Sequence, residues 1–430
     1  MLKAGFARVD ITPPLGLPMA GYFRERFSKG VLDPMELNAL ALSTEEGTIL
    51  IVAADLLTVK TPECHEIRTL ISQRTGVPAD HILLAVLHQH TTVFVGDWDV
   101  TTPLTDEAYL SVLYRKFADV AQMAMDDLQE ATMHVAERET AKPLSFVRRF
   151  LMEDGTYRTN PGRKNKDKVV RPASDADNTV RLVRFRREGA KDIALVNFST
   201  HPDVIGGELY SADWPGFVRR YVEADLTNVS CLLVNGAQGD TNHIDLFGDG
   251  STKGYEHSAY MGRMIADAVL AMFDQTRPCH TDGVFAKVDT VYVKSNTEGE
   301  ERYEECVAQK KAYERGELPH LTMEQLAETR RISNLRALPL YHPVVITVLS
   351  LGELALVGFG GEPFTDYANR ARAALPHKFT VAACCANGYA GYLPTGLAFQ
   401  QGGYEAKNSP FVPELEELVM GKTLEILKEL

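Results

Sequence analysis

Cysteine is scarce in this chain: there are six in 430 residues, and no pair has the C-x-x-C spacing of a zinc ribbon. Disulfide frameworks are typical of short chains rich in cysteine, and this chain is long and poor in cysteine. Cys384 and Cys385 are adjacent, so in a strand they would point to opposite faces, as two small buried apolar side chains. The cysteines therefore indicate reduced core thiols.

Long hydrophobic runs are also missing. The longest, around residues 49–59, is too short to span a bilayer. Residues 1–10 contain no continuous apolar stretch of signal-peptide length. Together with the reduced cysteines, these absences predict a soluble, cytoplasmic protein without a membrane span.

Basic residues are outnumbered, with 45 Lys and Arg against 58 Asp and Glu, and the formal net charge is −13. Nucleic acids and anionic membranes attract basic surfaces, so this balance argues against both as partners and leaves a small-molecule substrate. The chain is 45% hydrophobic and long enough to bury a substantial core.

Three apolar, strand-like runs each end in residue types that bind divalent metals. Residues 81–87 precede His88 and His90, residues 193–198 lead to His201, and residues 355–359 lead to Glu362. Because alternate strand residues point to the same side, both histidines of the first pair are expected to face one point. Two imidazoles and a carboxylate are a hydrolytic zinc set.

A single histidine at a strand end is more typical of a structural hydrogen bond than of a metal ligand. The recurrence of metal-binding residue types at three strand ends favours a metal site, and so does the local backbone chemistry. Proline follows both His201 and Glu362, and two glycines precede Glu362, which indicates a backbone held in a fixed conformation.

Strands and helices alternate along the chain. A helix is expected from Thr61 to Gly76, between strand 49–57 and the run that ends in His88. Strand 193–198 leads through a helix to strand 229–234, and strand 355–359 leads through a helix to strand 380–384. This order predicts an α/β fold of mixed β-sheets flanked by helices, with the site at the strand ends.

Two segments interrupt the alternation. Residues 145–171 indicate a β-hairpin followed by a basic loop, and residues 300–336 indicate a charged helical hairpin. We expect a single catalytic domain over residues 1–430 that carries both. The helical hairpin and exposed edge strands are compatible with a homodimer.

Seven short motifs occur in an order that spans most of the chain: Ala7–Pro14, Met19–Tyr22, His88–His90, Asn197–Pro202, Gly239–Asp240, Gly361–Pro363 and Asn387–Tyr392. Together they resemble the neutral/alkaline ceramidase superfamily. The resemblance implies the α/β fold of the ceramidase N-terminal domain and hydrolysis of an amide bond.

The resemblance also implies a set of metal ligands. The first histidine of His-x-His is His88, the His-Pro histidine is His201, the Gly-Glu carboxylate is Glu362, and the last tyrosine of Tyr-x-x-Tyr is Tyr392. These four would hold one Zn²⁺ per chain. His90 would then transfer a proton or orient substrate beside the metal.

Two departures from the superfamily affect the expected substrate. Asn242 occupies the position of a serine proposed to act in catalysis, and the chain shows neither the secretory signal nor the C-terminal β domain of secreted ceramidases. We therefore expect a zinc-dependent amidohydrolase acting on a small polar or anionic acyl substrate rather than on ceramide. The alternatives are a zinc-dependent esterase, lactonase or sugar-derivative enzyme, and a non-catalytic metal- or ligand-binding relative.

Substrate contacts are expected from the basic segment 148–171, because an arginine fork suits a carboxylate or phosphate. A solvated loop is the competing interpretation. The residues predicted to bind substrate are Arg148, Arg158, Arg171, Asn242 and Tyr389.

Four residues are predicted to take part in catalysis. His90 would transfer a proton, and Tyr392 could donate a hydrogen bond to the oxyanion. Asp240 could accept a hydrogen bond from the second ring nitrogen of a ligand histidine, and His243 could donate to substrate or bind a second metal. Turn structure is the alternative role of Asp240. Tyr22 could line the pocket.

Overall fold

The computed structural model describes residues 1–96, 106–318 and 321–430. Its strands are β1 Lys3–Asp10, β2 Gly30–Val31, β3 Glu36–Thr44, β4 Gly47–Ala54, β5 Ile82–Val86, β6 Gln129–Glu139, β7 Phe146–Val147, β8 Arg149–Met152, β9 Tyr157–Thr159, β10 Val169–Pro172, β11 Thr179–Arg187, β12 Asp192–Phe198, β13 Leu209–Tyr210, β14 Val229–Asn235, β15 Thr241–Asn242, β16 Arg277–Pro278, β17 Val284–Lys294, β18 Tyr341–Leu351, β19 Leu354–Phe359, β20 Glu362–Pro363, β21 Phe379–Ala383 and β22 Tyr392–Leu393.

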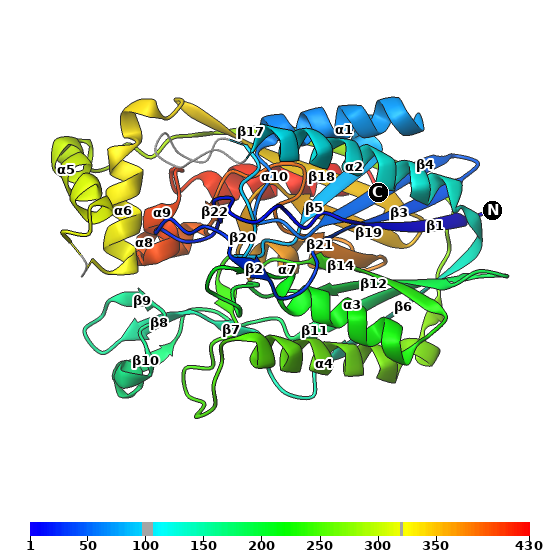
Figure 1. The fold of residues 1–430 in the computed structure, drawn as a ribbon, viewed down its shortest axis with the longest axis horizontal. Coiled ribbons are helices and arrows are strands. Elements are labelled where there is room, and N and C mark those ends of the chain that lie inside the picture. The colour runs from blue at the N-terminus through cyan, green and yellow to red at the C-terminus, as the bar shows by residue number, and fades with distance from the viewer. Residues whose placement is uncertain (97–105, 319–320) are drawn as a thin grey trace.

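Helices cover the sheets and extend beyond them at one end. They are α1 Thr61–Thr75, α2 Glu107–Asp126, α3 Asp213–Asp225, α4 Tyr255–Met272, α5 Tyr303–Glu314, α6 Met323–Ser333, α7 Thr365–Ala374, α8 Gly396–Gln401, α9 Tyr404–Asn408 and α10 Leu415–Leu427. The helix expected from Thr61 is confirmed, and it ends at Gly76 in the left-handed conformation. In Figure 1, α1 and α2 lie along the top, α3 and α4 at the bottom, and α5 and α6 at the left.

The large sheet has nine strands in the described residues, in the order β14-β12-β11-β6-β1-β3-β4-β5, with β16 beside β6. Only the edge pairs β4–β5 and β12–β14 are parallel. A second sheet has the order β17-β18-β19-β21, and its pair β19–β21 is parallel. The expected α/β fold with mixed sheets is thereby confirmed.

Strand alternation separates two cores. Leu37, Ala39 and Ala41 of β3 pack with α1 and α2, whereas Leu40 and Leu42 pack in a core that includes α3, α4 and both sheets. The apolar periodicity of the strands therefore fills the space on both sides of the large sheet.

The parallel edges of both sheets meet where their strands end. Asn387, just after β21, accepts from the Leu84 backbone N–H at 2.8 Å and donates to Ile82 O at 2.9 Å, so it covers the free edge of β5. Asn197 of β12 donates to Ala382 O at 3.0 Å, and Asn235 of β14 donates to Leu87 O at 3.1 Å. Buried amides thus join the strand ends around one point.

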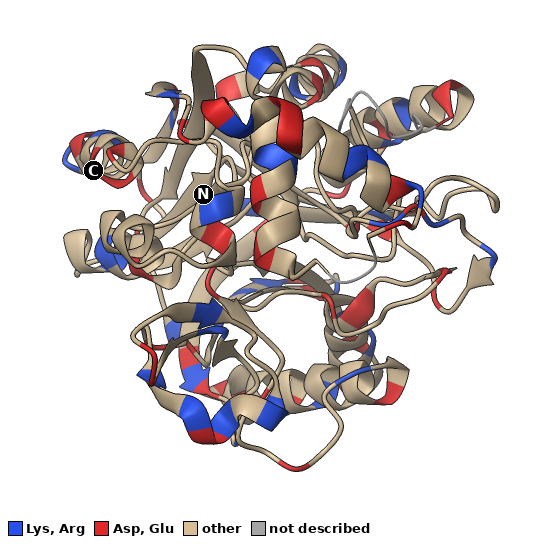
Figure 2. Ribbon diagram, turned by 90° about the vertical axis from the view of Figure 1, so that its left-hand side faces the viewer, with Lys and Arg blue, Asp and Glu red and all other residues tan. Residues whose placement is uncertain are grey.

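Residues 146–172 and 300–336 lie outside these layers. β8 pairs with β9 and β10 in a small antiparallel sheet, while α5 and α6 form a helix pair that contacts α9. Figure 2 views the molecule from the left-hand side of Figure 1 and shows Lys and Arg interspersed with Asp and Glu along the helices. No described helix is long and apolar enough to cross a bilayer.

Candidate metal centre

His88 and His90 lie beyond the end of β5. The strand ends at Val86, and His88 has a left-handed backbone with a φ of 74°. The prediction that strand alternation aims both imidazoles at one point is wrong in its mechanism, because the left-handed kink does this instead. The two rings pack edge to face, with centroids 5.1 Å apart and an interplanar angle of 79°.

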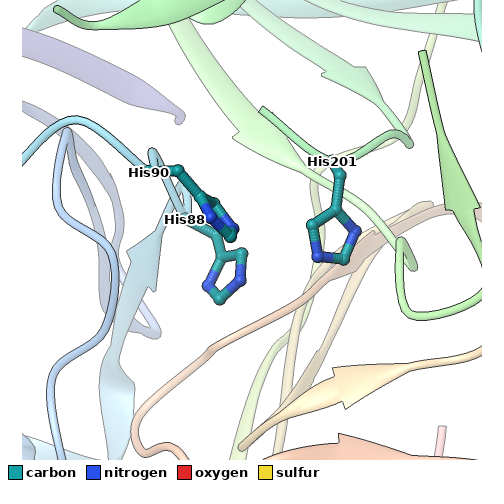
Figure 3. Close-up of side chains that lie close together, drawn as sticks. All are labelled: His88, His90 and His201. Atoms are coloured by element: carbon teal, nitrogen blue, oxygen red, sulfur yellow. The ribbon is translucent and has the colours of Figure 1, made fainter. Parts of the chain in front are cut away.

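His201 follows β12, which lies next to the edge strand β14 of the same sheet. Its ring centroid lies 5.2 Å from that of His88 and 5.8 Å from that of His90. Figure 3 shows the three imidazoles grouped around a common point. One ring nitrogen from each lies within 4.8 Å of the others.

Glu362 completes this group from a two-stranded sheet, β20-β22, that begins just after β19. It begins β20, which pairs in parallel with β22 so that Glu362 is in register with Tyr392. Its Oε2 lies 3.0 Å from His201 Nε2 and 3.4 Å from His88 Nε2, and its Oε1 accepts from the Tyr389 hydroxyl at 2.7 Å. A Cβ on Gly361 would lie 2.6 Å from Gly391 O, so the glycine allows the two short strands to approach.

Backbone carbonyls orient all three imidazoles. The Nδ1 atoms lie 2.8 Å from Leu57 O for His88, 2.9 Å from Gly21 O for His90 and 3.0 Å from Gln238 O for His201. These contacts assign the proton to Nδ1, and Nε2 is left as the inward-facing lone pair. The predicted role of Asp240 as the acceptor is therefore wrong, because main-chain oxygens perform it.

The inward-facing atoms fit a metal ion. His90 Nε2, His201 Nε2 and Glu362 Oε2 are buried without a hydrogen-bond partner in the described chain. Burial lowers the pKa of His88 to about 4, which keeps the ring neutral. Burial alone would raise the pKa of Glu362, but His88 and His201 lower it below its usual range. Neutral imidazoles with an ionised carboxylate are the donor set that zinc prefers.

Tyr392 lies against this group. Its ring stacks on His201 at a centroid distance of 6.3 Å and an interplanar angle of 22°. The guanidinium carbon of Arg148 lies 5.2 Å from the Tyr392 ring centroid. Burial raises the pKa of Tyr392 well above its usual value, so the phenol is protonated unless a cation offsets the burial. Tyr389, predicted to bind substrate, stacks on His88 and bonds Glu362.

The three arginines predicted to bind substrate have different surroundings. Arg148 is buried beside Tyr392, with its Nε 2.7 Å from Glu405 Oε1. Arg158 and Arg171 are exposed on the small sheet, where Arg158 bonds Asp154 at 2.5 Å and Arg171 bonds the Tyr157 hydroxyl at 3.4 Å. Only Arg148 is brought to the histidine group.

Sequence reasoning missed Tyr404 and Glu405 of α9. The Tyr404 ring packs edge-on against Tyr392 at 5.6 Å, and Glu405 is fully buried between Arg148 and Arg149. No motif marks them, although an acidic residue beside a tyrosine at the start of a short helix could have been paired with the basic segment. Both reach the site only through packing.

Tyr22 and Asp203 form the wall beside His90. The Tyr22 ring lies 5.7 Å from the His90 ring, and its hydroxyl donates to Asp203 in a short hydrogen bond. The Asp203 carboxylate lies 3.8 Å from His90 Nδ1, and burial raises its pKa to about 6. The predicted pocket residue Tyr22 thus contacts the site, whereas Asp203 was missed.

Asp240 and Asn242 have structural partners. Asp240 Oδ1 accepts from the backbone N–H of Thr365 at 2.9 Å and from its hydroxyl at 2.8 Å, which holds the first residue of α7. Asn242 donates to Asn160 at 2.9 Å and accepts from the Ile244 N–H at 3.0 Å. Their side chains therefore brace the segment that carries the carbonyls facing His201.

His243 is different, because both of its ring nitrogens are buried without a hydrogen-bond partner in the described chain. Burial lowers its pKa to about 3, and the nearby His257 lowers it further. The ring is only 2% exposed and lies 6.3 Å from that of His257. It therefore remains a neutral imidazole with one unused donor and one unused acceptor.

Comparisons by sequence identify no relative: neither the protein-family models nor the curated proteins contain a match. Solved structures do match. A neutral ceramidase from Pseudomonas aeruginosa aligns with a TM-score of 0.73 at 15% identity, covering 99% of this chain and 74% of that one. A ceramidase complexed with C2 aligns with a TM-score of 0.74 at 14% identity, with the same coverage. The chain therefore has the fold of neutral ceramidase, as the sequence motifs predict.

Proposed function

We propose that this protein is a zinc-dependent hydrolase of a non-peptide amide bond. The observation that carries the proposal is the convergence of His88, His90 and His201 on one buried point. Glu362 Oε2 lies 3.0 Å from His201 Nε2 and 3.4 Å from His88 Nε2. The Nε2 atoms of His90 and His201 and the Oε2 atom of Glu362 are buried without a hydrogen-bond partner in the described chain. Buried polar atoms are rarely left unpaired unless a ligand uses them. The names of both solved relatives support amide hydrolysis.

One Zn²⁺ per chain would be held by His88, His201, Glu362 and Tyr392, with His90 beside it. When bound, zinc acts as a Lewis acid on a carbonyl group and activates water as a nucleophile. The other tasks belong to the chain itself. Carbonyls of Leu57 and Gln238 hold the ligand imidazoles in one tautomer and orientation.

His90 is the proposed proton-transfer residue. Its Nδ1 faces Gly21 O, so its unpartnered Nε2 can accept a proton from an attacking water and return it to the leaving amine. A Cβ on Gly21 would meet the His90 ring nitrogen at 2.9 Å, and the glycine therefore permits this close approach.

Arg148 is the proposed donor to the negative charge that develops on the substrate oxygen, and donation to this oxygen is the alternative role of Tyr392 to metal binding. Tyr392 and Glu405 raise the pKa of Arg148 against the effect of burial, so the guanidinium stays charged. Because Glu405 already binds Arg148, we expect a neutral amide carbonyl, and no substrate carboxylate, beside this arginine.

The expected substrate is a small polar acyl amide. Hydrogen-bonding groups that could contact it surround the centre: His243, Tyr389 and Asp203. Anion recognition by Arg158 and Arg171 stays a prediction, since both are engaged with neighbours on the exposed small sheet.

The first test is metal content, measured by elemental analysis on protein purified without chelator. We expect about one zinc per chain in the wild type, lost in His201→Ala and kept in His280→Ala, an exposed histidine outside the site. A wild type that is empty and takes up no added zinc would exclude the metal mechanism.

Turnover distinguishes the remaining alternatives. A panel of N-acyl amides, esters and lactones should show zinc-dependent hydrolysis of an amide by the wild type and none by His201→Ala. Zinc-dependent cleavage restricted to esters or lactones would replace the amidohydrolase with the alternative enzyme. Stoichiometric zinc without turnover on the whole panel would favour a binding protein.

A further inference from the structure

The backbone at His88 is strained. Its φ of 74° lies in the left-handed region, which residues with a Cβ rarely adopt and which surrounding contacts must hold. Two backbone contacts contribute, because the N–H groups of His88 and Gln89 both donate to Leu56 O, at 2.9 Å and 3.2 Å. The His88 ring adds a bond to Leu57 O at 2.8 Å, and the buried side chain of the next residue, Gln89, adds further contacts.

Gln89 supplies its contacts from the opposite side of the chain. Its side chain is fully buried, and its amide nitrogen donates to Asp55 Oδ1 at 2.8 Å and to Ala212 O at 3.3 Å. The residue between the two histidines is thus fastened to the end of β4 and to the residue before α3. Rotation of the His88–His90 segment would break both bonds.

The anchor is itself held by a buried ion pair. Arg219 of α3 donates to Asp55 with both terminal nitrogens, at 3.0 Å and 2.5 Å, and its Nε lies 3.0 Å from Glu36 Oε2. Asp55 and Arg219 are 0% and 1% exposed. A bidentate pair fixes a carboxylate in direction as well as in position. Burying charges in this way is not by itself stabilising, which points to a geometric role.

We propose that Gln89, clamped by the Asp55–Arg219 pair, is a positioning residue that holds His88 in its left-handed conformation and thereby sets zinc affinity. The proposal rests on the proposed function, because it assumes that His88 is a zinc ligand. Gln89 touches no reacting atom, and it acts only through the backbone of the histidine segment.

The test measures zinc affinity in the full-length protein, stripped of metal and titrated with Zn²⁺ against a chromophoric chelator. Gln89→Met keeps the length of the side chain and removes the donor to Asp55. We expect it to weaken zinc binding by about tenfold or more, as loss of a ligand-orienting contact does in other metal sites.

A matched control separates positioning from stability. Asn38 is a fully buried amide on β3 that bonds Arg8 Nε at 2.6 Å within the same ion network and does not bond the histidine segment. Asn38→Leu should lower the melting temperature and leave the zinc dissociation constant unchanged. If Gln89→Met changes zinc affinity no more than Asn38→Leu does, the proposal is wrong.

A double-mutant cycle identifies the anchor. If Gln89 acts through Asp55, the effects of Gln89→Met and Asp55→Asn on zinc affinity should not add. Additive effects would show that Gln89 acts without Asp55 and would contradict the clamp. If Asp55→Asn does not fold, the zinc affinities of Gln89→Met and Asn38→Leu still test the proposal. A wild type without zinc affinity would refute the proposed function and, with it, this inference.

Discussion

At the scale of single residues, His243 keeps unused hydrogen-bonding capacity inside the protein. Its two ring nitrogens are buried without a partner, and an unpaired buried polar group costs about 1–3 kcal/mol. A fold retains such a cost most readily where a ligand uses the group, which agrees with the predicted contact between His243 and substrate.

His243→Leu should raise the free energy of unfolding at neutral pH by about 1 kcal/mol while weakening turnover, because an apolar side chain of similar size needs no partner. Melting temperature and steady-state kinetics measure the two effects. His342→Leu is the control: its Nε2 is also buried without a partner, but it lies on β18. If both variants are more stable than the wild type and neither loses turnover, His243 does not contact the substrate.

The same residue contributes to acid sensitivity. The folded-state pKa of about 3 lies below the ordinary value of 6.5, so between these pH values the unfolded chain binds a proton that the folded chain does not. The stability associated with neutral His243 is therefore lost as pH falls from about 6.5 toward 3. Denaturant unfolding of His243→Leu over this range should show a shallower pH dependence, and an unchanged slope would contradict the burial effect.

At the scale of elements, the short strand β20 holds Glu362 only because a glycine lies against it. A Cβ on Gly239 would come within 2.4 Å of Glu362 O and 2.9 Å of Pro363 O. The backbone N–H of Gly239 donates to Pro363 O at 2.8 Å. The loop after β14 and the strand β20 therefore form one unit, which Asp240 extends to α7.

Gly239→Ala should displace β20, lower stability by about 1–3 kcal/mol through overpacking and reduce zinc content. Thermal unfolding and elemental analysis measure the two results. Gly250→Ala is the matched control, since no heavy atom lies within 4 Å of its added Cβ. Full zinc occupancy in Gly239→Ala would mean that this contact does not position Glu362.

At the scale of the whole molecule, the proposed ligands join two sheets. His88 follows the edge strand β5 of the large sheet, His201 follows β12, which lies next to the other edge strand β14, and Glu362 follows β19 of the second sheet. A metal bound to all three would connect regions far apart in sequence, so its binding energy would contribute to the stability of the complete fold.

Zinc should therefore raise the melting temperature of the metal-free wild type. At a free zinc concentration 100 times the dissociation constant, the free energy of unfolding should rise by about 2.7 kcal/mol. His201→Ala should show little shift under the same conditions. Calorimetry with and without zinc measures the effect, and an identical melting temperature in both states would contradict a site that joins the sheets. The compatibility of the helical hairpin and edge strands with a homodimer, and the cytoplasmic location, stay predictions.

Much of the site could be predicted because it depends on local patterns. An apolar run followed by His-x-His, His-Pro or Gly-Gly-Glu-Pro marks a strand end within a few residues, and the structure brings His88, His201 and Glu362 together. The sequence could not show which of the three arginines Arg148, Arg158 and Arg171 lies at the site. They share one basic segment, and only its pairing in three dimensions buries Arg148 and leaves the other two in solvent.

The sequence by itself determined the order of strands and helices, the residue types at the strand ends and the resemblance that predicts the fold. Each of these depends on spacing over a few residues, where the backbone geometry is common to all proteins. Only the tertiary structure decided which groups surround the candidate site: the carbonyls facing each Nδ1, the contacts of Gln89 with Asp55 and Ala212, Tyr404 and Glu405. Their positions result from packing between segments up to hundreds of residues apart, which no local pattern encodes.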